Sequence, residues 1–128
     1  MYNFVLSETP VSKKNGKQII NRGGRTYLIP SNSHKTWHDN AGHELSIQTS
    51  QLRGIDLSMG KIRLIEIKFQ MGNKYRKDLD NLATSILDLL VDHGIIHDDS
   101  IFYVPELSLK YTGYVKDKPC TVITIHTL

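Results

Sequence analysis

The sequence lacks the features of a membrane protein and of a disulfide-stabilised protein. It has one cysteine among 128 residues, which excludes an internal disulfide. No run of about 18 apolar residues occurs, so no ordinary transmembrane helix is predicted. Its first residues lack both the basic region and the apolar stretch of a signal peptide, so we expect a cytoplasmic protein. Repeats and low-complexity segments are also absent, and the length predicts one domain over residues 1–128.

Basic residues are missing from one continuous part of the chain. No Lys or Arg occurs between Asp78 and Leu109, although this stretch holds seven of the 13 acidic residues. All 16 basic residues lie outside it, so the rest of the chain is strongly basic. Basic side chains attract polyanions, and carboxylates are the hard oxygen ligands that Mg²⁺ prefers. The segregation of charge therefore indicates a protein that binds a polyanion and holds divalent cations.

Alternating apolar residues predict four strands and a separate hairpin. A period of two is typical of a strand with one buried face. The four predicted strands are residues 4–6, 61–70, 107–111 and 122–125. Gly23 and Gly24 separate two further runs, 18–22 and 25–29, and glycine accepts the positive φ of a two-residue hairpin turn. Residues 113–119 connect the last two strands of the four, which suggests that these strands pair as a closing hairpin.

Two stretches have the apolar spacing of helices. In the first, Trp37, Ala41 and Leu45 fall on one helix face. The second begins at Leu79 and has Gly94 as its C-terminal stop. The predicted architecture is therefore α+β: a mostly antiparallel or mixed sheet with two helices packed on it.

Aspartates flank the second predicted helix on both sides. Asp78 and Asp80 stand at its start, and Asp98 and Asp99 follow its end. Either pair alone is explained by a helix cap or a turn, because aspartate accepts backbone N–H bonds at such positions. Four carboxylates in two short motifs exceed what capping requires. Carboxylates that converge repel one another unless a cation lies between them, so the set predicts a Mg²⁺ site.

The length of the helix decides whether the two pairs can meet. A helix from Asp80 to Asp92 is about 20 Å long. Residues 94–99, if extended, return about 16–20 Å. Asp99 therefore reaches the helix start only if the chain turns sharply and runs straight back along the helix. Otherwise a second subunit has to complete the site, and both arrangements are open at this point.

Two groups of basic residues are candidates for binding phosphate. Cations that neutralise phosphates release counterions, and this makes binding to nucleic acid depend on salt. One group lies in the N-terminal arm and hairpin, and the other immediately precedes Asp78. The candidates are Lys13, Lys14, Arg22 and Arg25 in the first group and Lys74, Arg76 and Lys77 in the second. For the hairpin group, a solvated polar surface is the alternative interpretation.

Several short motifs occur in the order found in a known family. Asp78-Leu79-Asp80-Asn81-Leu82 is followed by Leu87-Asp88-Leu89-Leu90 and then by Gly94-Ile95-Ile96-His97-Asp98-Asp99. With residues 10–15 and 24–31 upstream, this pattern resembles the RusA-type Holliday junction resolvases, in particular their phage-borne branch. The resemblance extends over roughly residues 8–125, which is nearly the whole chain.

The resemblance implies a homodimeric endonuclease that nicks two strands of a four-way DNA junction symmetrically. It implies Mg²⁺ as cofactor, with Mn²⁺ as a substitute, and roles in DNA recombination and repair. The three essential aspartates of the family map onto Asp78, Asp80 and Asp99. Family members commonly have a lysine four residues after the second aspartate, where this chain has Thr84. A junction-binding module without catalysis, or a nuclease for other branched DNA or for RNA, stays open as an alternative.

Overall fold

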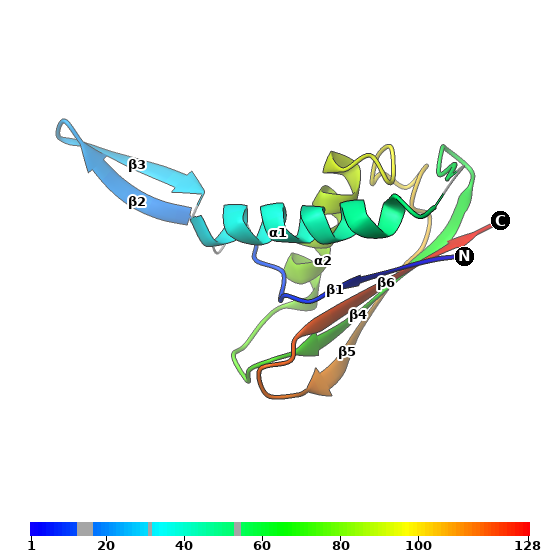
Figure 1. The fold of residues 1–128 in the computed structure, drawn as a ribbon. Coiled ribbons are helices and arrows are strands. Elements are labelled where there is room, and N and C mark those ends of the chain that lie inside the picture. The colour runs from blue at the N-terminus through cyan, green and yellow to red at the C-terminus, as the bar shows by residue number, and fades with distance from the viewer. Residues whose placement is uncertain (13–16, 31, 53–54) are drawn as a thin grey trace.

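The computed structural model describes residues 1–12, 17–30, 32–52 and 55–128. Four strands form one mixed sheet in the order β1-β6-β4-β5 (Figure 1). They are β1 (Tyr2–Leu6), β4 (Ile62–Met71), β5 (Leu107–Tyr114) and β6 (Cys120–Thr127). Both β1 and β4 pair antiparallel with β6, whereas β4 and β5 are parallel. The two edge strands of the sheet are therefore β1 and β5.

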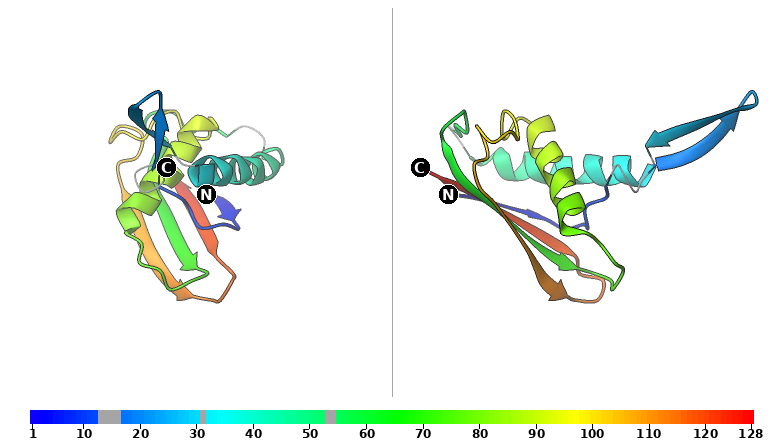
Figure 2. Two further views of the ribbon diagram at one scale, coloured as in Figure 1. Left: turned by 90° about the vertical axis from the view of Figure 1, so that its left-hand side faces the viewer. Right: turned by 180° about the vertical axis from the view of Figure 1, so that it is seen from behind.

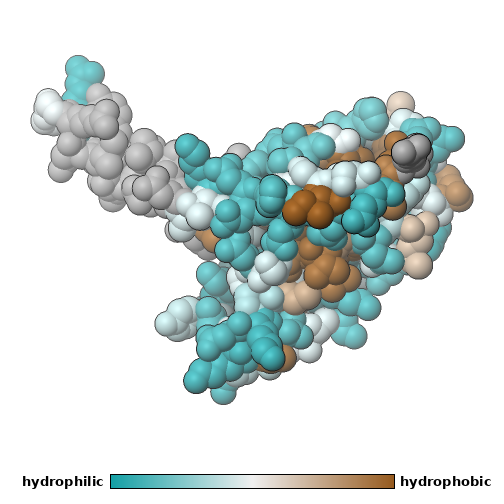
Figure 3. All heavy atoms as spheres, in the orientation of Figure 1, coloured by the Kyte–Doolittle hydropathy of each residue, from teal (hydrophilic) through white to brown (hydrophobic). Residues whose placement is uncertain are grey.

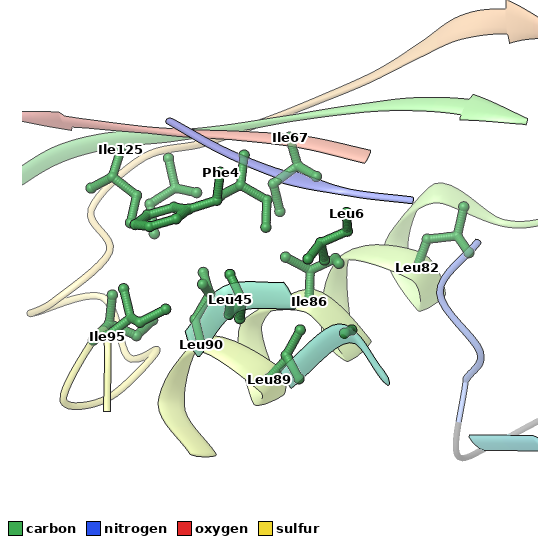
Figure 4. Packing of buried hydrophobic residues seen from close by; sticks show 14 of the residues in the cluster. Phe4, Leu6, Leu45, Ile67, Leu82, Ile86, Leu89, Leu90, Ile95 and Ile125 are labelled. Carbon is green, nitrogen blue, oxygen red and sulfur yellow. The ribbon is translucent and has the colours of Figure 1, made fainter. Parts of the chain in front are cut away.

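Two helices, α1 (Asn32–Thr49) and α2 (Leu79–Asp92), lie on the same face of this sheet (Figures 1 and 4). The core between the layers includes Phe4 from β1, Leu45 from α1 and Ile86 from α2, all with no exposed surface. Burying such a side chain stabilises the fold by about 1.5–3 kcal/mol. The predicted α+β architecture with two packed helices is confirmed. No described helix is both long and apolar enough to cross a membrane.

The alternation predicted for β4 is confirmed, and it explains the central place of this strand. Ile65, Ile67 and Phe69 are buried under the helices, while Arg63 and Lys68 are exposed. With ten residues β4 is the longest strand of the sheet. A long strand with a fully buried face is stabilised most when a hydrogen-bonded strand lies on each side of it.

The predicted closing hairpin between the last two strands is wrong. Strands β5 and β6 do not pair, because β4 lies between them: Ile65 is in register with Leu107 of β5 on one side and with Ile125 of β6 on the other. The link from β5 to β6 therefore crosses the end of β4, where Val115 N donates to Met71 O at 3.0 Å. A period of two indicates a strand and its buried face, but it does not indicate which strand lies next to it.

A separate two-stranded hairpin, β2 (Lys17–Arg22) and β3 (Arg25–Pro30), projects beyond the start of α1 (Figure 2). Its turn consists of Gly23 (φ 58°) and Gly24 (φ 77°). Positive φ at both central residues is the requirement of a type I′ turn, which suits the twist of a hairpin. The hairpin predicted around the two glycines is confirmed.

The end of α2 has the hydrogen bonds of a Schellman motif. Gly94 has φ 70°, and its N–H donates to Val91 O at 3.0 Å. Ile95 N donates to Leu90 O at 2.9 Å. Both bonds satisfy carbonyls that the last helical turn leaves without partners. The predicted stop at Gly94 is confirmed, and it directs the following residues into the core instead of back along the helix.

Candidate metal and DNA site at the start of α2

Asp78 is the N-cap residue of α2, and Asp80 lies in its first turn. The carbonyl of Asp78 accepts the N–H of Leu82 at 3.2 Å, but its carboxylate makes no capping hydrogen bond. Among the described residues, the Asp80 carboxylate accepts one hydrogen bond, from the neighbouring N–H of Asn81 at 2.9 Å. Both side chains are exposed. Helix capping therefore does not occupy the Asp78 carboxylate, and the two acids remain at the surface where a cation can reach them.

The loop between β4 and α2 places cations next to these acids. Lys74, Arg76 and Lys77 are all exposed there. Arg76 Nε lies 4.0 Å from Asp78 Oδ1, and the Arg76 side chain is 94% exposed. An ion pair this open contributes little to stability, so the arginine is free to turn towards a ligand. Figure 3 shows that this end of the molecule, with the β5–β6 turn beside it, is mainly hydrophilic.

A pocket of about 310 Å³ opens beside the loop. Its floor is apolar and aromatic, and its rim consists of the basic loop. The lining side chains are Phe69, Met71, Leu79, Leu82 and Tyr111, together with residues 73–77. Sequence reasoning missed this pocket because Tyr111 reaches it only through the parallel register that places Tyr111 beside Phe69. The alternating apolar pattern of β5 was the available signal, but that pattern does not show which strand lies next to β5.

Asp98 and Asp99 lie beyond the opposite end of α2. The N–H groups of Ile95 and Ile96 both donate to Leu90 O, and both side chains are buried. Figure 4 shows Ile95 at the far side of the core from Leu82, which is in the first turns of α2. With 14 residues, α2 is about 21 Å long. The segment thus does not run back along the helix, which was the condition for convergence within one chain.

The neighbours of this segment place it at the start of β4, whereas Asp78 follows the end of β4. Hydrogen bonds from Ser58 lower the pKa of Asp56 below its usual value, and the nearby Lys61 and His97 act in the same direction. The His97 ring stacks on Tyr103, with centroids 6.3 Å apart. Within the described ranges no group of three His, Cys, Asp or Glu residues is arranged to hold a metal ion. One chain brings Asp78 and Asp80 together but leaves Asp99 apart.

The other predicted DNA-binding residues belong to the N-terminal part of the chain. Lys13 and Lys14 lie outside the described residues. Arg22 ends β2 and Arg25 begins β3, and the two are in register across the turn. Arg25 is exposed. The hairpin therefore places these two arginine positions at a tip that projects from the body (Figure 1), apart from the acids at the start of α2.

Thr84 lies one helical turn after Asp80 and is exposed. Its hydroxyl donates to the backbone carbonyl of Asp80 at 2.9 Å. Such a bond back to the preceding turn is common for threonine in a helix. A cationic side chain at this position, four residues after Asp80, would face the acids. Thr84 contributes no such charge.

The start of α2 thus combines exposed acids with the exposed basic side chains of the preceding loop. The sequence matches the family model described as Endodeoxyribonuclease RusA over residues 8–126. The chain belongs to the RusA family of endodeoxyribonucleases, which confirms the resemblance found in its motifs. The family implies an endonuclease that resolves Holliday junctions. No curated protein matches the sequence.

Proposed function

We propose that the protein is a homodimeric, Mg²⁺-dependent endodeoxyribonuclease that resolves four-way DNA junctions by symmetric nicking. The observation that carries the proposal is the pair Asp78 and Asp80 beside the basic loop, in a chain that belongs to the RusA family. Carboxylates are ligands for Mg²⁺, and basic side chains are ligands for phosphate. A single surface therefore carries both kinds of ligand that phosphodiester cleavage requires.

The two carboxylates suit Mg²⁺, which proteins usually hold through one or two carboxylates while substrate phosphate and water complete its shell. The Asp78 carboxylate fits this role because it makes no capping bond. When bound, Mg²⁺ would lower the pKa of a coordinated water and offset the charge of the scissile phosphate, and Mn²⁺ would substitute. Without a cation, the two acids would repel a phosphate at this helix start.

The basic loop orients the DNA strand in this proposal. Lys74, Arg76 and Lys77 bind the phosphates on either side of the scissile bond. Arg76 also stays within 4.0 Å of Asp78, so it can exchange that carboxylate for a phosphate without moving far. At the hairpin tip, Arg22 and Arg25 bind the phosphates of a junction arm, with Lys13 and Lys14 in the preceding segment.

A second subunit supplies the third carboxylate. Asp99 lies at the opposite end of α2 from Asp78 and Asp80, and a partner related by a twofold axis can present its own Asp99 to them. The resulting dimer has two equivalent metal sites. Two sites related by a twofold axis match two symmetric nicks in a junction that itself has twofold symmetry.

The test compares three substrates: a mobile four-way junction, a linear duplex and RNA, each with Mg²⁺, with Mn²⁺ and with EDTA. We expect paired symmetric nicks in the junction only when the metal is present. Asp80→Asn should abolish them, whereas Asp88→Asn, a change of the same chemistry two turns further along α2, should keep them. Junction binding without cleavage in either metal would favour the alternative of a junction-binding module without catalysis. Thr84 is the residue behind this alternative, because its hydroxyl is bonded to the backbone and it carries no positive charge. Equal cleavage of linear duplex or of RNA would refute junction specificity.

A further inference from the structure

The four-stranded sheet has one face that no described helix covers, called here the open face. Both helices pack on the opposite face (Figures 1 and 2). Alternation along β4 places Lys68 on the open face, because its neighbours Ile67 and Phe69 are buried under the helices. Lys110 of β5 lies on the same face, since it is in register with Lys68. Both lysines are exposed.

The register sets two like charges side by side. Cations on neighbouring strands repel each other, and a cross-strand pair of like charge destabilises a sheet. Among the described residues, neither Lys68 nor Lys110 takes part in an ion pair. Glu66 lies on the same face, but its carboxylate is bonded to His126. The described part of the fold therefore supplies no counter-charge for the two lysines.

Two ordinary roles account for part of this arrangement. A lysine on an edge strand hinders the addition of a further strand, and this role suits Lys110 of β5. An uncovered face also needs polar residues. Neither role requires a cation at Lys68, because β4 is a central strand and the neutral Gln70 and Thr124 serve on the same face. The second cation therefore favours a ligand with negative charge.

The lysine pair is continuous with the basic loop before α2. Gln70, two residues further along β4, donates through Nε2 to Lys118 O at 2.7 Å. Lys118 belongs to the β5–β6 turn, where Lys116 is also exposed and Asp117 is the one acid. The turn in its own right contacts the loop, since Asp117 N donates to Gly72 O at 2.9 Å. Basic residues therefore extend from the loop over the turn to the open face.

We propose that the open face binds the phosphate backbone of a duplex DNA arm that leaves the site at the start of α2. The inference rests on the proposed function, because the arm belongs to the same DNA substrate. Phosphates complement the lysines in charge, and a bound phosphate offsets the repulsion within the cross-strand pair. The lysines of this surface are Lys68, Lys110, Lys116 and Lys118.

The composition of the open face favours a duplex over a single strand. Proteins that bind single strands commonly stack the bases on aromatic side chains. The register of the four strands places their described Phe and Tyr residues on the helix side, with Phe4, Phe69 and Tyr111 as examples. A duplex instead presents its phosphates on the outside, where lysines alone can bind them.

Salt-dependent binding in EDTA tests the inference without cleavage. The double variant Lys68→Gln/Lys110→Gln should bind a linear duplex and a four-way junction about tenfold more weakly in about 0.1 M salt. The slope of log affinity against log salt should fall by about two, one for each lysine. Phosphate contacts do not distinguish a branched from a linear duplex, so both substrates should lose equally.

Lys61→Gln is the matched control, because Lys61 is exposed immediately before β4, at the other end of this strand. Its affinity and slope should equal those of the wild type. An unchanged slope in the double variant would overturn the inference. A loss seen with single-stranded DNA or duplex RNA, but not with duplex DNA, would overturn the assigned ligand.

Charge reversal separates a binding role from a structural one. Lys68→Glu sets opposite charges side by side with Lys110, so the midpoint of urea denaturation should rise. Its affinity for duplex DNA should nevertheless fall further than that of Lys68→Gln. Lys68→Arg retains the cation and should keep the wild-type slope. Retained affinity in Lys68→Glu would overturn the inference, and a joint loss of stability and affinity would assign Lys68 a structural role instead.

Cleavage assays on the same proteins separate this inference from the proposed function. A wild-type protein whose duplex binding depends on the two lysines, but which cuts no junction in either metal, would retain the open face and refute the proposed function. A wild-type protein that nicks junctions symmetrically, while the double variant keeps its affinity and slope, would retain the function and refute the open face as a binding surface.

Discussion

The two ends of α2 carry the same residue type in opposite settings. At the start, Asp78 and Asp80 have a cationic loop and an apolar pocket beside them. Beyond the end, Asp98 and Asp99 lie in a segment without basic residues that exposes Ile101 and Phe102. The start combines basic side chains with an apolar pocket, whereas the other end has exposed apolar side chains and no Lys or Arg. Two short acidic motifs of one chain thus lie on two different surfaces, and the proposed function requires a second copy to bring them together.

Mixing two inactive proteins tests whether aspartates from the two ends of α2 act together across subunits. Asp80→Asn and Asp99→Asn should each lose at least about 100-fold in junction cleavage, as the loss of a catalytic group commonly does. If each site uses acids from both subunits, a heterodimer has one intact site and one doubly altered site. An equal mixture after subunit exchange should therefore recover about a quarter of wild-type nicking.

The control for this experiment is each variant mixed with itself, which should recover nothing. No recovery in the mixed sample, although exchange is demonstrated by differently tagged subunits, would assign all three aspartates to one chain.

A second comparison is between the basic loop and the hairpin tip. Arg76→Ala should lower the cleavage rate about 10- to 100-fold, because Arg76 lies beside the acids. Arg25→Ala should weaken junction binding a few-fold, with little change in the rate at saturating protein. In both variants the slope of log affinity against log salt should fall by about one. An equal loss of rate in the two variants would remove the distinction between the loop and the tip.

Thr84→Lys tests whether the start of α2 needs one more positive charge for cleavage. It adds a cation at an exposed position one turn from Asp80, at a cost of only one hydroxyl bond to the backbone. We expect a several-fold increase in the cleavage rate and a helix stabilised by about 0.3 kcal/mol through the pair with Asp80. Thr84→Ser is the matched control and should leave the rate unchanged. A rate that stays constant in Thr84→Lys would show that the basic loop already supplies the required charge.

The smallest expected effect concerns the other end of the helix. Gly94 has φ 70°, and a Cβ there would meet no atom within 4 Å, so only backbone strain opposes a side chain. Gly94→Ala should lower the free energy of unfolding by about 1–2 kcal/mol, measured by urea denaturation. Gly94→Asn should cost less, because asparagine tolerates this conformation better. Equal losses in the two variants would contradict backbone strain as the cause.

Much of the fold follows from local patterns in the sequence. The glycine pair of the hairpin, the alternation of β4 and the stop at Gly94 are each local, and each is confirmed. The pairing of β5 was not predictable in this way, because the pattern of β5 does not indicate whether its neighbour in the sheet is β4 or β6. The same limit explains the missed pocket, which needs Tyr111 beside Phe69.

The predictions for the candidate site differ in the same way between local and long-range features. Asp78 and Asp80 were predicted at the helix start because the helix itself is evident in the sequence. The position of Asp99 depended on the route of the short segment after Gly94. The sequence pattern at Ile95 and Ile96 fits an extended strand and a buried turn equally well. In the structure both side chains are buried in the core.

The place of β6 in the sheet has a consequence for the order of events during synthesis. Strand β6 lies between β1 and β4, so residues 120–127 bridge the first strand of the chain to the central one. Tyr2 can find its partner Ile125 only after the residues up to Ile125 have left the ribosome. Contacts so distant in sequence form late and slowly. A chain made only as far as β5 consequently lacks the strand that joins β1 to β4.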